Sequence, residues 1–93
     1  MQGDVKAAYT AADAALIPYR TRIKGLFFNV ASAGTDPIVI YDNASTAAGT
    51  VLLTVGTTAV GGNTVYIPAQ GILATNGVYV DTGDADSVTV FYG

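Results

Sequence analysis

The segment Ser87-Val88-Thr89-Val90-Phe91-Tyr92 decides the fold class of this chain. Its alternate positions 88, 90 and 92 hold Val, Val and Tyr, while positions 89 and 91 hold Thr and Phe. A period of two is typical of a β-strand, because successive side chains point to opposite faces of a sheet. Since the run consists of good β-formers, we expect this strand in the middle of a sheet.

Turn residues divide the preceding part of the chain into similar runs. Residues 50–68 alternate aliphatic with polar or aromatic residues on both sides of Gly61-Gly62-Asn63, which predicts a β-hairpin. Asn76-Gly77 separates residues 71–75 from residues 78–82, and both positions of this dipeptide tolerate a positive φ. The sequence therefore predicts a second hairpin there.

Two other runs carry more specific expectations. In the first half of the first hairpin, Val51, Leu53 and Val55 are expected to share one face of a strand. Residues 38–41 read Ile-Val-Ile-Tyr and are apolar at every position, so both faces of that strand are expected to be buried, either in the core or in an interface with a partner.

The run from Arg20 to Val30 changes character at Gly25. One alternate set of positions is basic before Gly25 and apolar after it: Arg20, Arg22 and Lys24, then Leu26, Phe28 and Val30. Because a strand cannot move one face from solvent into the core without bending, we expect a kink or bulge at Gly25. The alternative is a strand that runs from the rim of the domain into its centre.

Residues 1–19 are open to three interpretations. Asp4 can cap an alanine-rich helix that ends at Pro18. Residues 5–10 and 14–19 can instead form two strands around an Ala-Ala-Asp turn, and we favour this interpretation because Tyr9-Thr10 is typical of a strand. The third interpretation is an extended arm that clasps a neighbouring molecule.

These runs predict a single all-β domain over residues 1–93, a small antiparallel β-sandwich or barrel of about seven strands. No apolar run approaches the roughly 20 residues that a membrane-spanning helix needs. The first residues, Met-Gln-Gly-Asp-Val-Lys, lack the pattern of a secretory signal. We therefore expect no membrane partner.

The composition argues against catalysis. The sequence contains no His, Cys, Glu or Trp. Proton transfer near neutral pH usually needs His or a tuned Glu or Lys, and thiol nucleophiles and zinc sites need Cys or His. We therefore expect no enzyme and predict no catalytic residue, no cofactor and no metal ligand.

Few charges suggest that part of the surface is covered. Charged residues make up 12% of the sequence, against about 25% in an average soluble domain. Exposed apolar surface commonly marks contact sites, so we expect another subunit or a partner there. The alternative is a monomer coated with Thr and Gly. The net charge of −3 argues against a nucleic-acid partner.

The charges are also unevenly distributed. All cations, Lys6, Arg20, Arg22 and Lys24, precede residue 25, and only aspartates follow. Arg20, Arg22 and Lys24 form a basic row that can protect an edge strand, bind a phosphate or pair with an acidic partner. A domain with one basic strand and acidic loops can also dock head to tail with another copy or onto an acidic partner. The densest acidic cluster, Asp81, Asp84 and Asp86, has enough oxygens for Ca²⁺ but lacks the spacing and Glu of an EF-hand, and Asp is also a favoured turn residue.

The order of several blocks resembles small virion structural proteins of tailed bacteriophages, particularly short ones from phages of aquatic bacteria. The resemblance covers about residues 20–93. Its most specific parts are the stretch from Pro68 through Gly71-Ile72 to Asn76-Gly77-Val78-Tyr79-Val80, and the final Val88-Thr89-Val90-Phe91-Tyr92-Gly93. Its other blocks are Arg20–Phe28, Ile38–Asn43 and Gly49–Val55.

The resemblance implies a non-enzymatic particle component located in the virion. Such proteins commonly decorate or cement the capsid by binding the assembled shell, and they form trimers or sit at junctions between shell subunits. The implied partners are the major capsid protein or other virion proteins, and a homo-oligomer. One alternative function is a receptor- or glycan-binding knob on a fibre, which needs either a surface patch of Tyr with Asp or a Ca²⁺ site at Asp81, Asp84 and Asp86. The other alternative is an adaptor between larger proteins.

Overall fold

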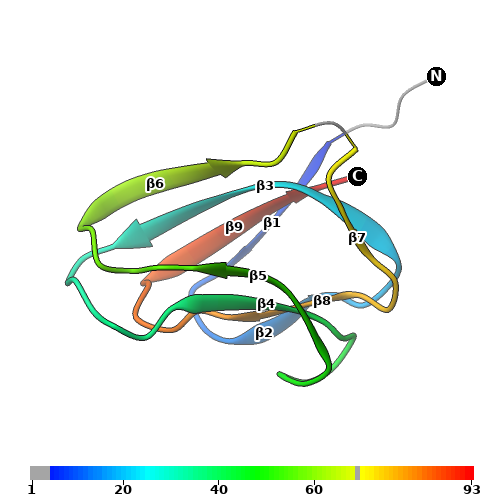
Figure 1. Ribbon diagram of the computed structural model, residues 1–93, viewed down its shortest axis with the longest axis horizontal. Helices are drawn as coiled ribbons and strands as arrows, with labels where there is room; N and C mark the ends of the chain where they lie inside the picture. Colours follow the sequence, from blue (N-terminus) through cyan, green and yellow to red (C-terminus); the bar gives the residue numbers. More distant parts are fainter. Residues whose placement is uncertain (1–4, 69) are drawn as a thin grey trace.

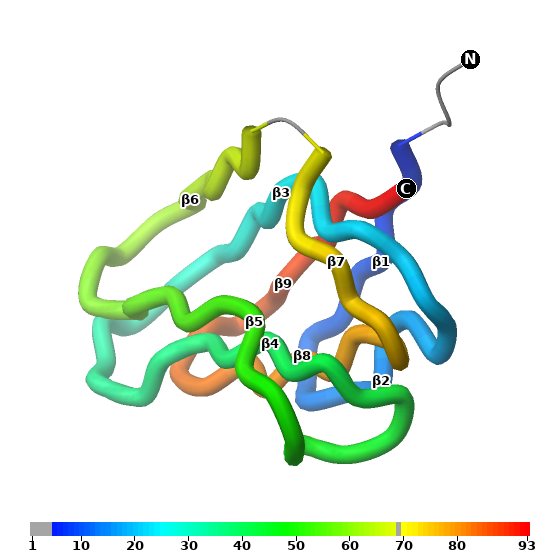
Figure 2. The backbone as a smooth tube through the Cα atoms, turned by 45° about the vertical axis from the view of Figure 1, so that its right-hand side comes forward, coloured from blue at the N-terminus to red at the C-terminus, as the bar shows by residue number. Residues whose placement is uncertain are grey.

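Alternating β-forming runs and intervening turn residues fold this chain into a sandwich of two antiparallel sheets (Figures 1 and 2). The computed structural model describes residues 5–68 and 70–93. Over that part of the chain there are nine strands, rather than the seven expected, and no helix that could cross a bilayer. The strands are β1 (Lys6–Thr10), β2 (Ala14–Ile17), β3 (Thr21–Val30), β4 (Ile38–Asp42), β5 (Thr50–Val55), β6 (Gly61–Tyr66), β7 (Ile72–Ala74), β8 (Val78–Asp81) and β9 (Ser87–Tyr92).

The first sheet has the strand order β1-β9-β3-β6. On the same side of β3 as β6, the short strand β7 pairs with the first residues of β3, and β6 pairs with the remainder. The second sheet has the order β2-β8-β4-β5. The prediction of an antiparallel β-sandwich is confirmed. The predicted place of residues 87–92 in the middle of a sheet is also confirmed, because β9 lies between β1 and β3.

Both predicted hairpins are wrong. β5 belongs to the second sheet and β6 to the first, and β7 and β8 are divided in the same way. Their connections cross from one sheet to the other instead of closing a two-stranded ladder. A turn dipeptide specifies a reversal of the chain, but the partner of each strand is decided by which sheet can bury its apolar face.

A hairpin that the sequence did not predict joins β4 to β5. Asn43 organises its connection, because its side-chain Oδ1 accepts hydrogen bonds from the backbone N–H groups of Ser45 and Thr46, both at 2.9 Å. Asparagine commonly forms such local turns. The register of this pair shifts between Ile40 and Tyr41, so Leu52 is an extra residue on β5.

This β-bulge overturns the clean alternation expected for Val51, Leu53 and Val55. Val51 is 50% exposed, whereas Leu52 and Leu53 are both half-buried. An extra residue reverses the faces of all the positions that follow it in the strand.

The bulge expected at Gly25 is confirmed. Ile23 lies opposite Tyr92 and Gly25 lies opposite Phe91, so Lys24 is the extra residue. Before the bulge Thr21 and Ile23 point into the core, and after it Leu26, Phe28 and Val30 do so. The basic and the apolar halves of one sequence pattern thus lie on opposite faces of β3.

Among the described residues of the N-terminal segment, the strand interpretation is confirmed. β1 and β2 do not pair with each other, however, because β1 pairs β9 and β2 pairs β8. The expected strands are therefore present, but the expectation that they pair with each other around the turn is wrong. The capping role of Asp4 lies outside the described residues.

The core lies between the sheets and draws on both. Its buried members are Ile17, Ile23, Leu26, Phe28, Val30, Ile38, Ile40, Ala74, Val78, Val80, Ala85, Val88 and Val90. On β4 only Ile38 and Ile40 are buried, while Val39 and Tyr41 are half-buried. The expectation of a buried face is confirmed for the inner face of this strand, whereas its outer face is only half-buried within the single chain.

Candidate interaction surfaces

The aspartates of the 81–86 loop accept hydrogen bonds from backbone N–H groups. Asp81, Asp84 and Asp86 each hold a different group: Gly83 N at 3.0 Å, Asp36 N at 2.9 Å and Ala31 N at 2.9 Å. Within residues 5–68 and 70–93, no group of three or more acidic side chains is placed to hold a metal ion. These carboxylates stabilise loops, and their arrangement offers no support for the calcium site considered from the sequence.

Positive and negative side chains lie at opposite ends of the sandwich. Lys6 lies opposite Tyr92, and Tyr92 lies opposite Ile23, so all the basic residues are at the end where β9 finishes. Most of the acidic side chains are at the other end, where β9 begins: Asp13, Asp36, Asp81, Asp84 and Asp86. Among the aspartates that the structure describes, the exception is Asp42, which accepts a hydrogen bond from Asn76 N at 2.7 Å at the basic end.

This arrangement produces an electric dipole along the strands, in a molecule whose longest extent is 40 Å. Two copies with their long axes antiparallel attract each other through these charges, while two parallel copies repel.

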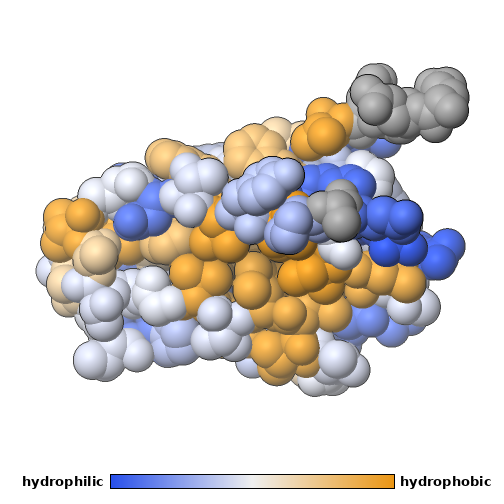
Figure 3. Space-filling model, turned by 45° about the horizontal axis from the view of Figure 1, so that its top comes forward, coloured by the Kyte–Doolittle hydropathy of each residue, from blue (hydrophilic) through white to orange (hydrophobic). Residues whose placement is uncertain are grey.

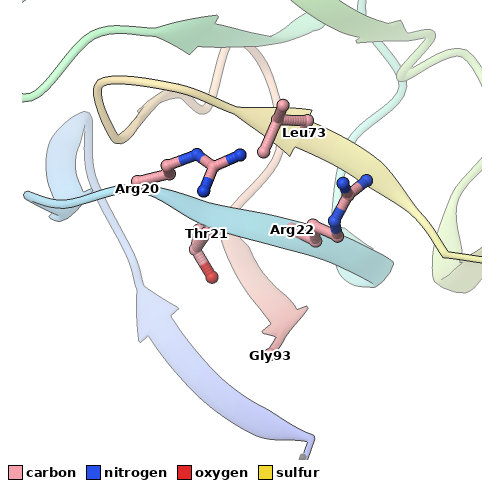
Figure 4. A pocket seen from close by; sticks show the side chains of 5 residues that line it. All are labelled: Arg20, Thr21, Arg22, Leu73 and Gly93. Atoms are coloured by element: carbon pink, nitrogen blue, oxygen red, sulfur yellow. The ribbon is translucent and has the colours of Figure 1, made fainter.

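Arg20 and Arg22 of the basic row line an open pocket of about 240 Å³ at one end of the first sheet. Figure 4 shows the side chains of Arg20 and Arg22 on one side of the β3 ribbon, with Leu73 of β7 close by, and Thr21 on the other side. Gly93 completes the lining. Guanidinium groups in this position suit the carboxylate or phosphate of a partner.

The hypothesis that the basic row protects a sheet edge is wrong, because β3 is an interior strand. It has β9 on one side and β6 and β7 on the other. Lys24 extends from the bulge and donates a hydrogen bond to the carbonyl oxygen of Gln70 at 3.2 Å.

The outer face of the first sheet carries one aromatic side chain from each of four strands. We call Tyr9, Phe91, Phe27 and Tyr66 the aromatic face. The registers pair Tyr9 with Thr89, Thr89 with Phe27 and Phe27 with Thr64, which puts the aromatic residues on the same face in diagonal positions. Diagonal neighbours of this kind lie about 7–8 Å apart.

Three of these four rings are exposed, and Phe91 is half-buried. Tyr66 is 80% exposed, Tyr9 64% and Phe27 41%. The ring of Phe27 covers Gly62, where an added Cβ would meet Phe27 Cζ at 3.0 Å. Among the described strand positions of β1, β9, β6 and the part of β3 from Gly25 onward, the residues of this face are uncharged. The basic row continues the same face at one end.

The sequence analysis missed the aromatic face as a unit. The bulge after Ile23 reverses the parity of β3, so the alternation alone does not place Phe27 beside Phe91. The order of strands in the sheet is also needed to bring Tyr9 and Tyr66 onto the same surface. Tyr residues are frequent at protein interfaces, and that general preference was the only available signal.

One long side of the sandwich is open. β1 contacts β2 along the other side, whereas β5 and β6 are separated and unpaired with each other (Figure 2). Half-buried aliphatic side chains line the opening: Leu52, Leu53 and Val55 from the second sheet, and Val65, Ile67 and Ile72 from the first sheet and its connection. Figure 3 shows a continuous apolar band on this part of the surface, with hydrophilic residues at one end.

Comparisons with protein-family models, with curated proteins and with solved structures find no match.

Proposed function

We propose that this protein is a non-enzymatic component of a bacteriophage particle that decorates or cements the capsid by binding the assembled shell. Three features support the proposal: the sequence blocks over residues 20–93 that resemble small virion proteins, the absence of His, Cys and Glu, and the aromatic face. The aromatic face is the observation that carries it, because an exposed and uncharged aromatic surface is typical of a protein contact.

The aromatic face and the basic row together suggest the chemistry of the partner surface. The four rings suit an apolar patch, and Arg20 and Arg22 at its end suit carboxylates beside that patch. A protein that binds only the assembled shell stabilises it by mass action, and many copies on a symmetric lattice reinforce one another even when each contact is weak.

The test is binding of the purified protein to emptied capsids of the phage that encodes it. We expect co-sedimentation with the capsids and a higher temperature of capsid disruption. Tyr66→Ser and Tyr9→Ser should weaken binding by at least about tenfold each if the aromatic face is the contact. Val60→Ser, at a 64% exposed residue outside the aromatic face, should leave binding unchanged.

Absence of capsid binding would contradict the proposed decoration of the shell. Binding that is insensitive to both Tyr substitutions would contradict the assignment of the aromatic face as the contact. Mass spectrometry of purified virions supplies an independent measure. A decorating protein should be present in hundreds of copies, and a tail adaptor in a handful.

A second candidate function is a receptor- or glycan-binding knob on a tail fibre. Exposed aromatic rings such as Tyr9 and Tyr66 are the observation that favours it, because they can stack on the apolar faces of sugars. Since Asp81, Asp84 and Asp86 each hold a separate backbone N–H, binding should persist in EDTA. A glycan array probed with and without the chelator distinguishes this candidate from shell decoration.

A further inference from the structure

The edge strand β5 lacks the usual protection against pairing with another strand. It pairs with β4 on one side, and no strand of residues 5–68 or 70–93 pairs with it on the other. Its sequence, Thr-Val-Leu-Leu-Thr-Val, has no charge and no proline. Natural edge strands usually carry Lys or Pro, are very short or are covered. Among the other edge strands, β1 has Lys6, β7 is only three residues long and β2 is contacted by β1. The edge strand β6 also lacks charge and proline, but it begins with two glycines, which are poor strand formers.

The opening beside β5 exposes aliphatic surface that a neighbour can cover. Leu52, Leu53 and Val55 pack against the core but remain half-buried, and Val51 is half exposed. On the facing sheet, Val65 and Ile72 are also half-buried. Burial of such surface stabilises an association by about 25 cal/mol per Å² before the costs of binding.

The charge distribution selects the neighbour and its orientation. A second copy of this chain can place its own β5 beside the first in either a parallel or an antiparallel arrangement. The parallel arrangement brings the two basic ends together, while the antiparallel arrangement brings each basic end beside the acidic end of the other copy. Lys6, Arg20, Arg22 and Lys24 outnumber Asp42 at the basic end, so the antiparallel arrangement is favoured over the parallel one. Asp42, which lies opposite Thr50 of β5, opposes this attraction in part.

We propose that two copies of this chain associate through antiparallel pairing of their β5 strands about a two-fold axis perpendicular to the sheets. This pairing makes the second sheets of the two copies continuous. The same axis turns the aliphatic opening of each copy toward that of the other. Because the same edge is used by both copies, the contact is isologous, and the assembly closes as a dimer instead of extending into a fibre.

The pairing is independent of the proposed function, because it uses the open side of the sandwich and leaves the aromatic face free. The dimer also differs from the trimer that the sequence resemblance implies. Shell binding and self-association can therefore be measured, and can fail, separately.

The first test is the mass of the full chain by sedimentation velocity over a range of concentrations. We expect a dimer for the wild type and at least about a tenfold weaker dimer for Val51→Lys, because a charge at the edge opposes strand pairing. Val5→Lys is the matched control, since Val5 is 62% exposed and precedes β1 at the opposite edge of the molecule. It should dimerise as the wild type does, and circular dichroism should show that both variants are folded.

The second test concerns the orientation. Replacing Arg20 and Arg22 by Glu should weaken an antiparallel dimer, and added salt should weaken the wild-type dimer by screening its charges. The same double substitution would strengthen a parallel dimer. A monomeric or trimeric wild type, an unaffected Val51→Lys dimer, or a dimer strengthened by the double substitution would each overturn the proposal.

Discussion

Gly83 illustrates how a single residue can determine a loop. It has a φ of 57° and lies in the turn that Ala85 N closes by donating to Thr82 O at 3.0 Å. A Cβ at this position would collide with the backbone carbonyl oxygens of Pro37 and Asp36. The loop that joins β8 to β9 thus packs too closely on the loop before β4 for any side chain.

We predict that Gly83→Ala lowers the free energy of unfolding by about 2 kcal/mol or more, because it adds left-handed strain and a backbone clash. Gly56→Ala is the control, since a Cβ at Gly56 meets nothing within 4 Å. It should change the stability by less than about 0.5 kcal/mol. Urea denaturation with comparison of midpoints and slopes measures both, and equal effects would contradict the prediction.

A second prediction at this scale concerns Tyr92. A hydrogen bond with the Tyr19 side chain raises the pKa of Tyr92 above the ordinary value for tyrosine, with desolvation as a smaller contribution. Because the neutral hydroxyl is favoured in the folded state, its stabilising contribution is complete below the ordinary pKa, about 10, and is lost as the pH rises through the raised folded pKa.

We therefore expect Tyr19→Phe to move the highest tyrosinate titration step to lower pH, as followed by ultraviolet absorbance. Tyr66→Phe, at an 80% exposed residue on the outer face of the first sheet, is the control and should leave that step in place. A titration unaffected by Tyr19→Phe would show that the hydrogen bond does not hold the proton of Tyr92.

At the scale of elements, the bulge in β3 has the largest effect on the surface. It allows Arg22, at an even-numbered position, and Phe27, at an odd-numbered position, to lie on the same outer face. In a regular strand these two positions would lie on opposite faces. Without it, the alternation that directs Leu26, Phe28 and Val30 into the core would direct Arg22 there as well.

We predict that deletion of Lys24 is tolerated and lowers the free energy of unfolding by less than about 2 kcal/mol, because it removes only the extra residue of the bulge. Ile23, which is 1% exposed, stays inward opposite Tyr92, and Arg22 stays outward. Lys24→Ala keeps the length of the chain and should cost less than about 1 kcal/mol, since it removes one exposed hydrogen bond to Gln70. Circular dichroism and urea denaturation measure both variants. A deletion variant that does not fold would show that the bulge itself is required.

The elements also show where prediction from the sequence ended. Asn76-Gly77 correctly marked the end of one strand and the start of the next, yet β7 and β8 lie in different sheets. Gly25 marks a bulge in the sequence because alternate positions are basic before it and apolar after it. The bulge at Leu52 has no such signal. A run of uncharged residues looks the same with or without an extra residue.

At the scale of the whole molecule, the two sheets share one core. Ile23, Leu26 and Val88 of the first sheet and Ile40 and Val80 of the second are members of the same buried cluster. Because neither sheet retains a buried face without the other, partial unfolding of one sheet exposes the core of both.

We therefore predict a single cooperative unfolding transition. Far-ultraviolet circular dichroism and tyrosine fluorescence should give the same midpoint, and the calorimetric enthalpy, roughly 65 kcal/mol near 60 °C for 93 residues at about 0.7 kcal/mol each, should equal the van't Hoff enthalpy. The Val51→Lys variant is the suitable material, because dimer dissociation would otherwise make the midpoint depend on concentration. Separate transitions for the two probes would contradict the shared core.

The class of the fold, the approximate limits of most strands and the bulge at Gly25 follow from the amino-acid sequence, because they depend on local alternation and on turn chemistry. The small number of groups capable of catalysis follows from it as well. The pairing of the strands and the separation of acidic and basic side chains to opposite ends became visible in the folded molecule alone. The same holds for the surface formed by Tyr9, Phe27, Tyr66 and Phe91. The physical reason is that the order of strands in a sheet depends on how distant segments bury their apolar faces together, and a local pattern carries no information about that choice.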